Sequence, residues 1–197
     1  MNLLSALRAD IREWAVGRNW LVRIPVLLLF GAIFKTWCAD PSASSMFWAL
    51  NLGLHELGHL LFRPLGEWWG IVGGTVTQCA APLFSFLVFF RQRDYFALSF
   101  SFGWLATNLF EMANYIADAR AMIIPLVSPF GGEVWHDWNY LLSRAGWLAW
   151  DHALAGWVRA GGAISMVVGL AYGAWVLWEM AVSHPHGKLP DMNDVPH

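Results

Sequence analysis

Long apolar segments recur along this chain and limit its fold more than any other feature. They cover about residues 20–37, 45–62, 80–90, 95–119 and 153–178. A helix that crosses the hydrocarbon core of a bilayer needs about 20 apolar residues. The composition agrees, because 57% of the 197 residues are hydrophobic and only 13% are charged, whereas soluble domains carry about 25% charged residues. The sequence therefore predicts an all-α integral membrane protein with roughly four to six transmembrane helices.

Three parts are expected along the chain. Residues 1–19 carry Arg8, Arg12 and Arg18 between apolar positions at helical spacing, a pattern typical of an amphipathic helix on a membrane surface. Residues 20–182 form the polytopic membrane domain, and residues 183–197 form a polar, disordered tail. Because Lys and Arg collect on the inner side of multi-pass proteins, the arginine distribution places the N-terminus in the cytoplasm.

A glycine-rich segment follows the second apolar run. It contains Gly66, Gly70, Gly73 and Gly74, interleaved with alternating Val and Thr. This pattern predicts a β-hairpin or a re-entrant loop rather than a helix. Such backbone cannot face lipid, so we expect it to be buried in protein or to line a wet cavity. Pro82 then opens the next span.

Charge and cysteine content exclude two classes of partner and site. The net charge is −2 and the Lys and Arg residues are scattered, which argues against a nucleic-acid partner. Cys38 and Cys79 lack ligand-like spacing, so neither a disulfide framework nor a cysteine zinc site is indicated. The lipid bilayer is the expected partner, and the sequence leaves open a membrane-protein partner or a homo-oligomer.

One motif carries chemistry: His55, Glu56 and His59 form an HExxH pattern inside the second apolar segment. On a helix the two histidines lie one turn apart, so both imidazoles can reach one Zn2+ ion. Glu56 can then take a proton from a zinc-activated water and pass it to a leaving amine. Charged residues at membrane depth cost roughly 2.5–3.5 kcal/mol each, which argues against a chance cluster. The motif predicts a zinc site with Glu56 as general base.

The surroundings of the motif extend the pattern. LGLHELGHLLF in an apolar segment is followed by GIVGGTVTQ and then by Pro82. Over roughly residues 45–90 the chain resembles the site-2 protease family of intramembrane zinc metalloproteases. The resemblance implies that His55 and His59 bind zinc, that Glu56 activates water, and that a re-entrant hairpin follows the motif helix. The Leu-Asp-Gly motif that supplies this family's third ligand is not found in the sequence.

The third ligand must therefore come from other residues. His136 and Asp137 follow a Gly-Gly pair and open an apolar stretch, where a helix start could aim either side chain at the metal. The alternative is a His-Asp pair that caps a helix.

A second set of candidates lies on one helical face. Asn108, Glu111, Tyr115 and Asp118 are spaced 3, 4 and 3 residues apart. A polar stripe in a membrane helix should face a cavity or a partner rather than lipid. Glu111 and Asp118 are therefore runners-up for the third ligand, although Asp118 could instead pair with Arg120 at the interface.

Substrate contacts are expected near the motif. Gly73 and Gly74 could present a strand edge to an unwound substrate, and Gln78 and Asn108 could contact it by hydrogen bonds; burial of the Gln78 amide is the alternative. Asn51, one turn before His55, is expected either to bond a ligand or substrate or to link two helices.

Together these features predict a membrane-embedded zinc metallopeptidase that hydrolyses peptide bonds of a membrane-associated protein or peptide substrate. Two other classes use the same motif. One is a zinc-dependent hydrolase of a lipid-linked amide or ester. The other is a non-catalytic metal-binding membrane protein.

Overall fold

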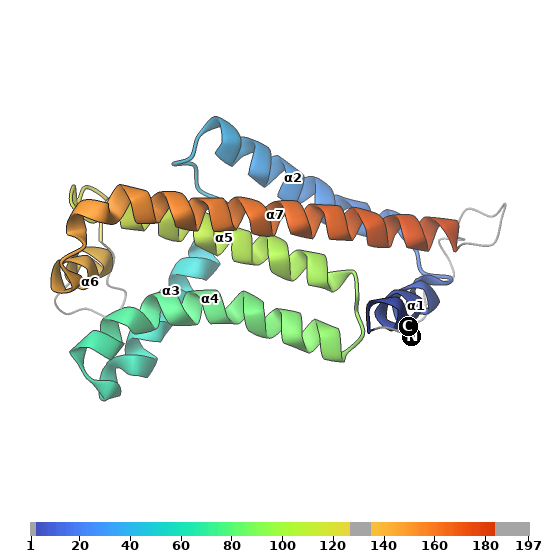
Figure 1. The fold of residues 1–197 in the computed structure, drawn as a ribbon, viewed down its shortest axis with the longest axis horizontal. Coiled ribbons are helices and arrows are strands. Elements are labelled where there is room, and N and C mark those ends of the chain that lie inside the picture. Colours follow the sequence, from blue (N-terminus) through green and yellow to red (C-terminus); the bar gives the residue numbers. More distant parts are fainter. Residues whose placement is uncertain (1–2, 127–134, 184–197) are drawn as a thin grey trace.

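A computed structural model describes residues 3–126 and 135–183 (Figure 1). Throughout these two ranges the regular structure is helical and contains no strand, which confirms the all-α class. The α-helices are α1 (Leu3–Ala15), α2 (Ile24–Ala39), α3 (Trp48–Phe62), α4 (Glu67–Arg91), α5 (Ala97–Ala117), α6 (Asp137–Ala145) and α7 (Asp151–Val182). The predicted polar tail beyond residue 183 lies outside the described residues.

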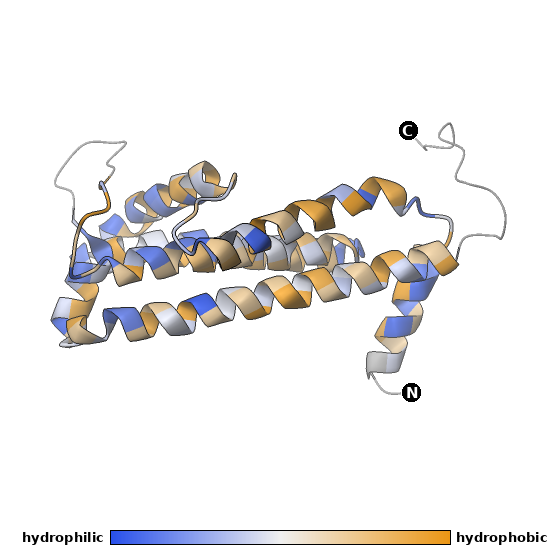
Figure 2. Cartoon of the chain, turned by 90° about the horizontal axis from the view of Figure 1, so that it is seen from above, coloured by the Kyte–Doolittle hydropathy of each residue, from blue (hydrophilic) through white to orange (hydrophobic). Residues whose placement is uncertain are grey.

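Within the described residues, three segments are long and apolar enough to cross a membrane. They are Leu21–Ala39, which contains α2, Glu67–Arg91, which is α4, and Leu148–Val182, which contains α7. Figure 2 shows apolar colours along much of the long helices and blue bands on α1, the helix nearest the N-terminus. Length and composition thus support a membrane protein. The number of four to six spans stays a prediction, because three described segments meet the length and composition of a span. Helix α3, which carries the second predicted span, has only 15 residues.

Helix α5 lies between α7 and α4 in the view of Figure 1, and it packs against both. Small side chains suit this position, because Ser99, Ser101 and Ala106 are all buried. Helix α2 is held on the same assembly by Trp37, whose ring stacks on Phe110 with centroids 4.3 Å apart. The central position of α5 carries its second half to the face of α3 that bears the HExxH motif.

The predicted β-hairpin is wrong: Gly70, Gly73 and Gly74 lie in the first half of the continuous helix α4, and Gly66 precedes it. A re-entrant path of this segment stays a prediction. Packing explains the glycines, because a Cβ on Gly73 would lie 2.6 Å from both the Gly58 oxygen and Phe62 Cβ. Close contact between α3 and α4 therefore outweighs the low helix propensity of glycine. Pro82 also lies inside α4 rather than at the start of a span, a position that membrane helices tolerate.

The predicted N-terminal helix is present as α1, and it packs against α7. Ile11 and Ala15 are buried, and Arg12 Nε donates to Glu179 Oε2 at 3.1 Å. Arg8 lies 3.8 Å from the other Glu179 oxygen. Because Glu179 is only 2% exposed, these arginines provide the charge that a buried carboxylate needs.

The short helix α6 begins at the His136–Asp137 pair. His136 caps it, since its Nδ1 accepts a hydrogen bond from the Asn139 N–H at 3.2 Å. Gly146, with a φ of 70°, ends the helix in the left-handed conformation. The predicted capping role of the His-Asp pair is thus confirmed for His136. Asp137, the first residue of α6, is left to point toward α3.

Candidate metal centre

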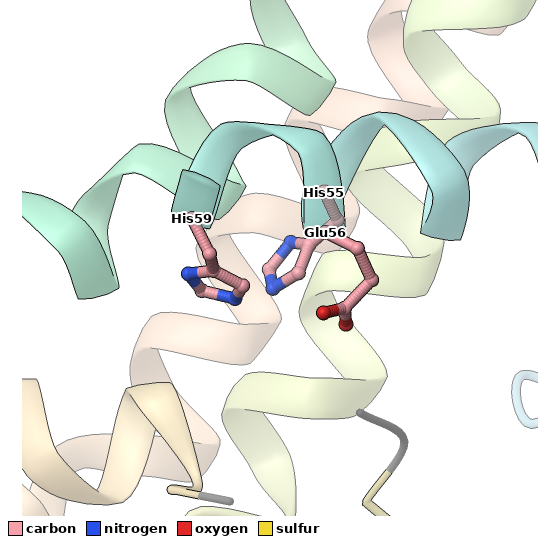
Figure 3. Close-up of side chains that lie close together, drawn as sticks. All are labelled: His55, Glu56 and His59. Atoms are coloured by element: carbon pink, nitrogen blue, oxygen red, sulfur yellow. The ribbon is translucent and has the colours of Figure 1, made fainter. Parts of the chain in front are cut away.

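The HExxH motif lies on the second half of α3, and its three polar side chains leave the helix on one side (Figure 3). One potential ligand atom from each of His55, Glu56 and His59 lies within 4.8 Å of the other two. The spacing of four residues brings the two imidazoles together, with ring centroids 4.7 Å apart. This cluster could hold a metal ion.

Helix α4 fixes the orientation of both imidazoles. The Nδ1 atom of His59 lies 2.8 Å from the Gly70 carbonyl oxygen, and that of His55 lies 3.0 Å from Gln78 Oε1. Because both partners are acceptors, each Nδ1 must carry the proton. In the neutral imidazoles, Nε2 therefore has a free lone pair. This is the arrangement of metal-binding histidines, whose second nitrogen is usually held by an outer acceptor.

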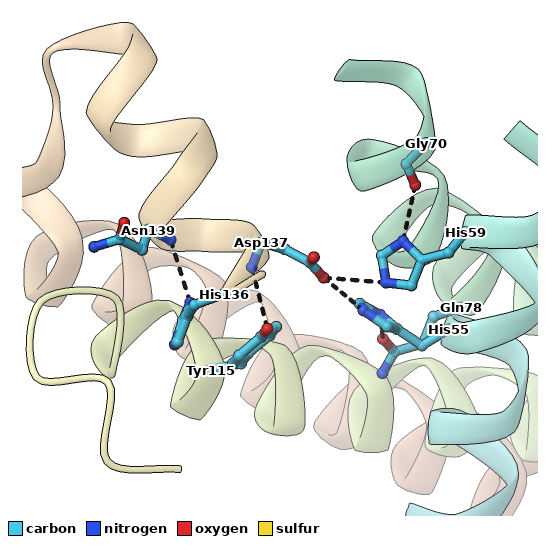
Figure 4. A network of polar contacts seen from close by, with 8 residues as sticks. All are labelled: His55, His59, Gly70, Gln78, Tyr115, His136, Asp137 and Asn139. Atoms are coloured by element: carbon cyan, nitrogen blue, oxygen red, sulfur yellow. Dashed lines mark hydrogen bonds and ion pairs between the residues drawn. The ribbon is translucent and has the colours of Figure 1, made fainter. Parts of the chain in front are cut away.

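Asp137 faces both Nε2 atoms, although it lies far from them in the sequence (Figure 4). Its Oδ2 is 2.7 Å from His55 Nε2 and 3.4 Å from His59 Nε2. Three lone-pair atoms that face one another need a positive charge between them, either as protons on the imidazoles or as a metal ion. Burial raises the pKa of the Asp137 carboxyl, but its hydrogen bonds and charge interactions with His55 and His59 outweigh this and lower the pKa below its usual value.

Helix α5 and the segment after it hold Asp137 in place. The Tyr115 hydroxyl accepts a hydrogen bond from the Asp137 N–H at 3.1 Å, and its ring packs 4.3 Å from that of His136. His136 Nε2 donates to Asp118 Oδ2 at 3.3 Å. Asp118 also accepts from the backbone of Ile123 and Ile124, at 3.0 Å each. The start of α6 is thus tied to the end of α5.

These contacts separate the four candidates for a third ligand. Asp137 lies at the histidines, whereas both ring nitrogens of His136 are engaged elsewhere, with Asn139 and Asp118. Asp118 serves the His136 contact rather than pairing with Arg120, which instead bonds Asp151 at 2.7 Å. Glu111 accepts hydrogen bonds from Asn51 and Ser45. The sequence had left these candidates open because only the tertiary structure distinguishes them.

The residues expected to contact substrate have other surroundings. Gly74 is pressed against the motif, since a Cβ there would lie 2.7 Å from His55 Nε2. Gly73 lies at the contact of α3 with α4, and Gln78 is buried against His55. Asn108 is 0% exposed and donates to the Trp104 carbonyl of its own helix. With the segment helical, Gly73 and Gly74 present no strand edge, and their contact with a substrate stays a prediction.

A cavity of about 1070 Å³ opens beside the cluster. Glu56 lines it together with both histidines and Asp137, and the cavity extends to Arg63 and Glu67 on one side. It also reaches α5 and the segments around residues 42–44 and 124–126. A substrate large enough to fill it would meet the potential metal ligands and Glu56 together.

Sequence reasoning missed Tyr115 as the residue that holds Asp137, and Gly70 as the carbonyl that orients His59. Tyr115 was visible in the polar stripe of the fourth apolar segment, but nothing in its spacing identified the Asp137 backbone as its partner. A backbone carbonyl leaves no sequence signal at all, because every residue has one.

Comparisons of the chain with protein-family models, with curated proteins and with solved structures found no match.

Proposed function

We propose that this protein is a membrane-embedded zinc metallopeptidase whose site is formed by His55, His59, Asp137 and Glu56. The observation that carries the proposal is the convergence of His55 Nε2 and His59 Nε2 on Asp137 Oδ2. Both imidazoles are oriented by hydrogen bonds at Nδ1. Glu56 lies beside this set and lines the cavity.

The donor set fits zinc. Catalytic zinc sites combine three protein ligands from histidine and carboxylate with a fourth position open to water or substrate. Two neutral imidazoles and one carboxylate supply that combination here, and the cavity supplies access. Bound zinc would polarise a carbonyl group and lower the pKa of water from 15.7 to about 7.

Glu56 supplies the proton transfer in this proposal. Its carboxylate accepts a proton from the attacking water while the water oxygen bonds to the carbonyl carbon of the peptide. It then returns that proton to the amide nitrogen as the C–N bond breaks. Asp137 and the two imidazoles would hold the metal through atoms that carry no proton, namely the carboxylate oxygen and the two Nε2 atoms. Gln78 and the Gly70 carbonyl keep the imidazole protons on Nδ1, away from the reacting atoms.

The membrane setting defines the substrate. We propose a multi-pass protein of four to six spans with its N-terminus in the cytoplasm, similar to the site-2 protease family, and a membrane-associated protein or peptide as substrate. The three apolar segments and the many exposed apolar side chains of the long helices support this setting. A peptide would enter the cavity in an unwound form, because a carbonyl hydrogen-bonded within a helix is hard to attack.

The test compares purified wild-type protein with Glu56→Gln, both loaded with zinc in liposomes. A library of membrane-protein peptides is added, and the products are identified by mass spectrometry. We expect the wild type to cleave peptide bonds and the variant to lose about 10²–10⁴-fold in rate while it keeps its zinc.

Two outcomes would contradict the proposal. Equal cleavage by both proteins would remove Glu56 from the reaction. The other outcome is a zinc-loaded wild type that cleaves no peptide. If it hydrolyses an added lipoprotein extract, the substrate is a lipid-linked amide or ester. If it does not, the protein binds metal without catalysis.

A further inference from the structure

Glu111 is a carboxylate at the cavity wall that the proposed reaction does not use. It comes from the apolar helix α5 and lines the same cavity as Glu56 and the histidines. Its two oxygens accept hydrogen bonds from Ser45 Oγ at 3.0 Å and from Asn51 Nδ2 at 2.8 Å. Both donors are neutral, and no Lys, Arg or His of residues 3–126 and 135–183 lies in ion-pair contact with it.

A buried network fixes the orientation of this carboxylate. Asn51 is 0% exposed, and its Oδ1 accepts from Trp104 Nε1 at 2.8 Å. The Asn51 amide nitrogen is thereby directed at Thr107 Oγ1, 3.1 Å away, and at Glu111. A carboxylate has about four lone-pair positions, so two donors leave it with free acceptor capacity, and Glu111 lines the cavity. The expectation that Asn51 links two helices is confirmed by these bonds between α3 and α5.

The position of Glu111 relative to the metal site follows from helix geometry. Glu111 lies one turn before Tyr115, whose hydroxyl contacts Asp137. Asn51, its hydrogen-bond partner, lies one turn before His55. One turn is about 5.4 Å, and an extended peptide advances about 3.3 Å per residue. A substrate group held by Glu111 would therefore lie within about two residues of the bond at the metal site.

We propose that Glu111 binds an ammonium group of the peptide substrate, which places the scissile bond at the metal centre. This inference rests on the proposed peptidase function. An ammonium group supplies the charge that a carboxylate at membrane depth requires, and its N–H groups can donate to the acceptor positions that Ser45 and Asn51 leave free. Two sources carry this group: the amino terminus of the peptide and the side chain of a lysine.

The experiment measures cleavage of one substrate peptide in four forms. These are the free peptide, its N-acetylated form, a form with norleucine for lysine, and the doubly changed form. We expect loss of the critical amine to raise KM by about tenfold or more. Glu111→Gln, which keeps the shape and an acceptor for Asn51, should raise KM to the same extent for the amine-bearing peptide only. Glu67→Gln is the matched control, since Glu67 is another carboxylate of the cavity wall.

Each outcome decides the source or rejects the site. If acetylation raises KM in the wild type but not in Glu111→Gln, the bound group is the amino terminus. If norleucine raises KM in the wild type but not in Glu111→Gln, the bound group is the lysine side chain. If wild type cleaves all four forms equally, or if Glu111→Gln leaves the preference intact, Glu111 does not bind substrate. If the variant does not fold, the wild-type series still tests the inference, because equal cleavage of all four forms rejects an ammonium site.

A binding measurement separates this inference from the proposed function. Zinc-loaded Glu56→Gln protein, which is expected to be inactive, is titrated with leucine hydroxamate and with its N-acetyl form. We expect leucine hydroxamate to bind more tightly than its N-acetyl form, and this difference to disappear in Glu56→Gln/Glu111→Gln. That result supports the ammonium site even if no peptide is cleaved. Equal binding of the two compounds, with cleavage that depends on Glu56, overturns only the ammonium site at the amino terminus and leaves the peptidase proposal intact.

Discussion

Asp137 Oδ2 lies 2.7 Å from His55 Nε2, although 82 residues separate them in the chain. The contact joins the first turn of α6 to the middle of α3. It places a carboxylate opposite two imidazoles whose protons are held on the far side of each ring. The whole proposal for the metal centre depends on this contact.

The first prediction concerns Gln78, which holds the His55 Nδ1 proton. Gln78→Leu removes the only acceptor at that nitrogen within the described ranges, so the ring loses its fixed tautomer. We expect zinc affinity to fall by about 10–100-fold, as measured by competition with a chelator. Cys79→Ala changes the next residue of α4 and should leave the affinity unaltered. An unchanged affinity in Gln78→Leu would show that the His55 orientation does not depend on this bond.

The second prediction concerns the space beside the imidazoles. In Gly74→Ala the new Cβ would lie 2.7 Å from both His55 Nε2 and His59 Cε1. Overpacking of this kind costs about 1–3 kcal/mol, so we expect a lower unfolding temperature and weaker zinc binding.

Gly53→Ala is its control, because a Cβ at that position in α3 meets nothing within 4 Å. It should stabilise the protein by up to about 1 kcal/mol through helix propensity. Thermal unfolding in detergent measures both variants. If Gly74→Ala binds zinc and unfolds like the wild type, α3 and α4 are not packed as closely as the structure shows.

The glycine-rich segment also shows where sequence reasoning fails. Local propensity identifies Gly73 and Gly74 as helix breakers, and only the partner helix α3 reveals that they permit close packing. The HExxH motif was recognisable because its chemistry depends on a spacing within one helix. Asp137 could be proposed, but not distinguished from its neighbour His136, because the direction of each side chain depends on how α6 meets α5.

The apolar character of the long helices could be predicted because it follows from composition alone. The limits of α4 could not, since a proline and several glycines in one segment ordinarily end a helix. The role of Glu111 was equally hidden. Its partner Asn51 comes from another helix and depends in turn on Trp104.

The third prediction concerns the attachment of α1. Replacing both Arg8 and Arg12 with Met leaves the buried Glu179 without its cations. Loss of one side of a buried ion pair costs about 3–5 kcal/mol, and the half-exposed arginines reduce this to about 1–3 kcal/mol. We expect faster hydrogen exchange in the amides of α1 and a lower unfolding temperature.

A third substitution provides the control for this effect. Adding Glu179→Met to the double variant removes the uncompensated charge, and it should restore much of the lost stability. Zinc binding should not change in either variant, because their contacts lie between α1 and α7 rather than at α3. If hydrogen exchange in the α1 amides does not change in the double variant, the apolar contacts of Ile11 and Ala15 are sufficient to hold α1 against α7.

The most direct measurement of the proposed centre is the zinc content per chain of purified wild type, Asp137→Ala and His136→Ala, determined by mass spectrometry after dialysis. These adjacent residues have the same sequence context but different contacts: Asp137 faces the two Nε2 atoms, and His136 caps α6. We predict one zinc per chain in the wild type, retention in His136→Ala with some loss of stability, and loss of zinc in Asp137→Ala. Full zinc in Asp137→Ala, or a wild type that binds none, would contradict the proposed centre.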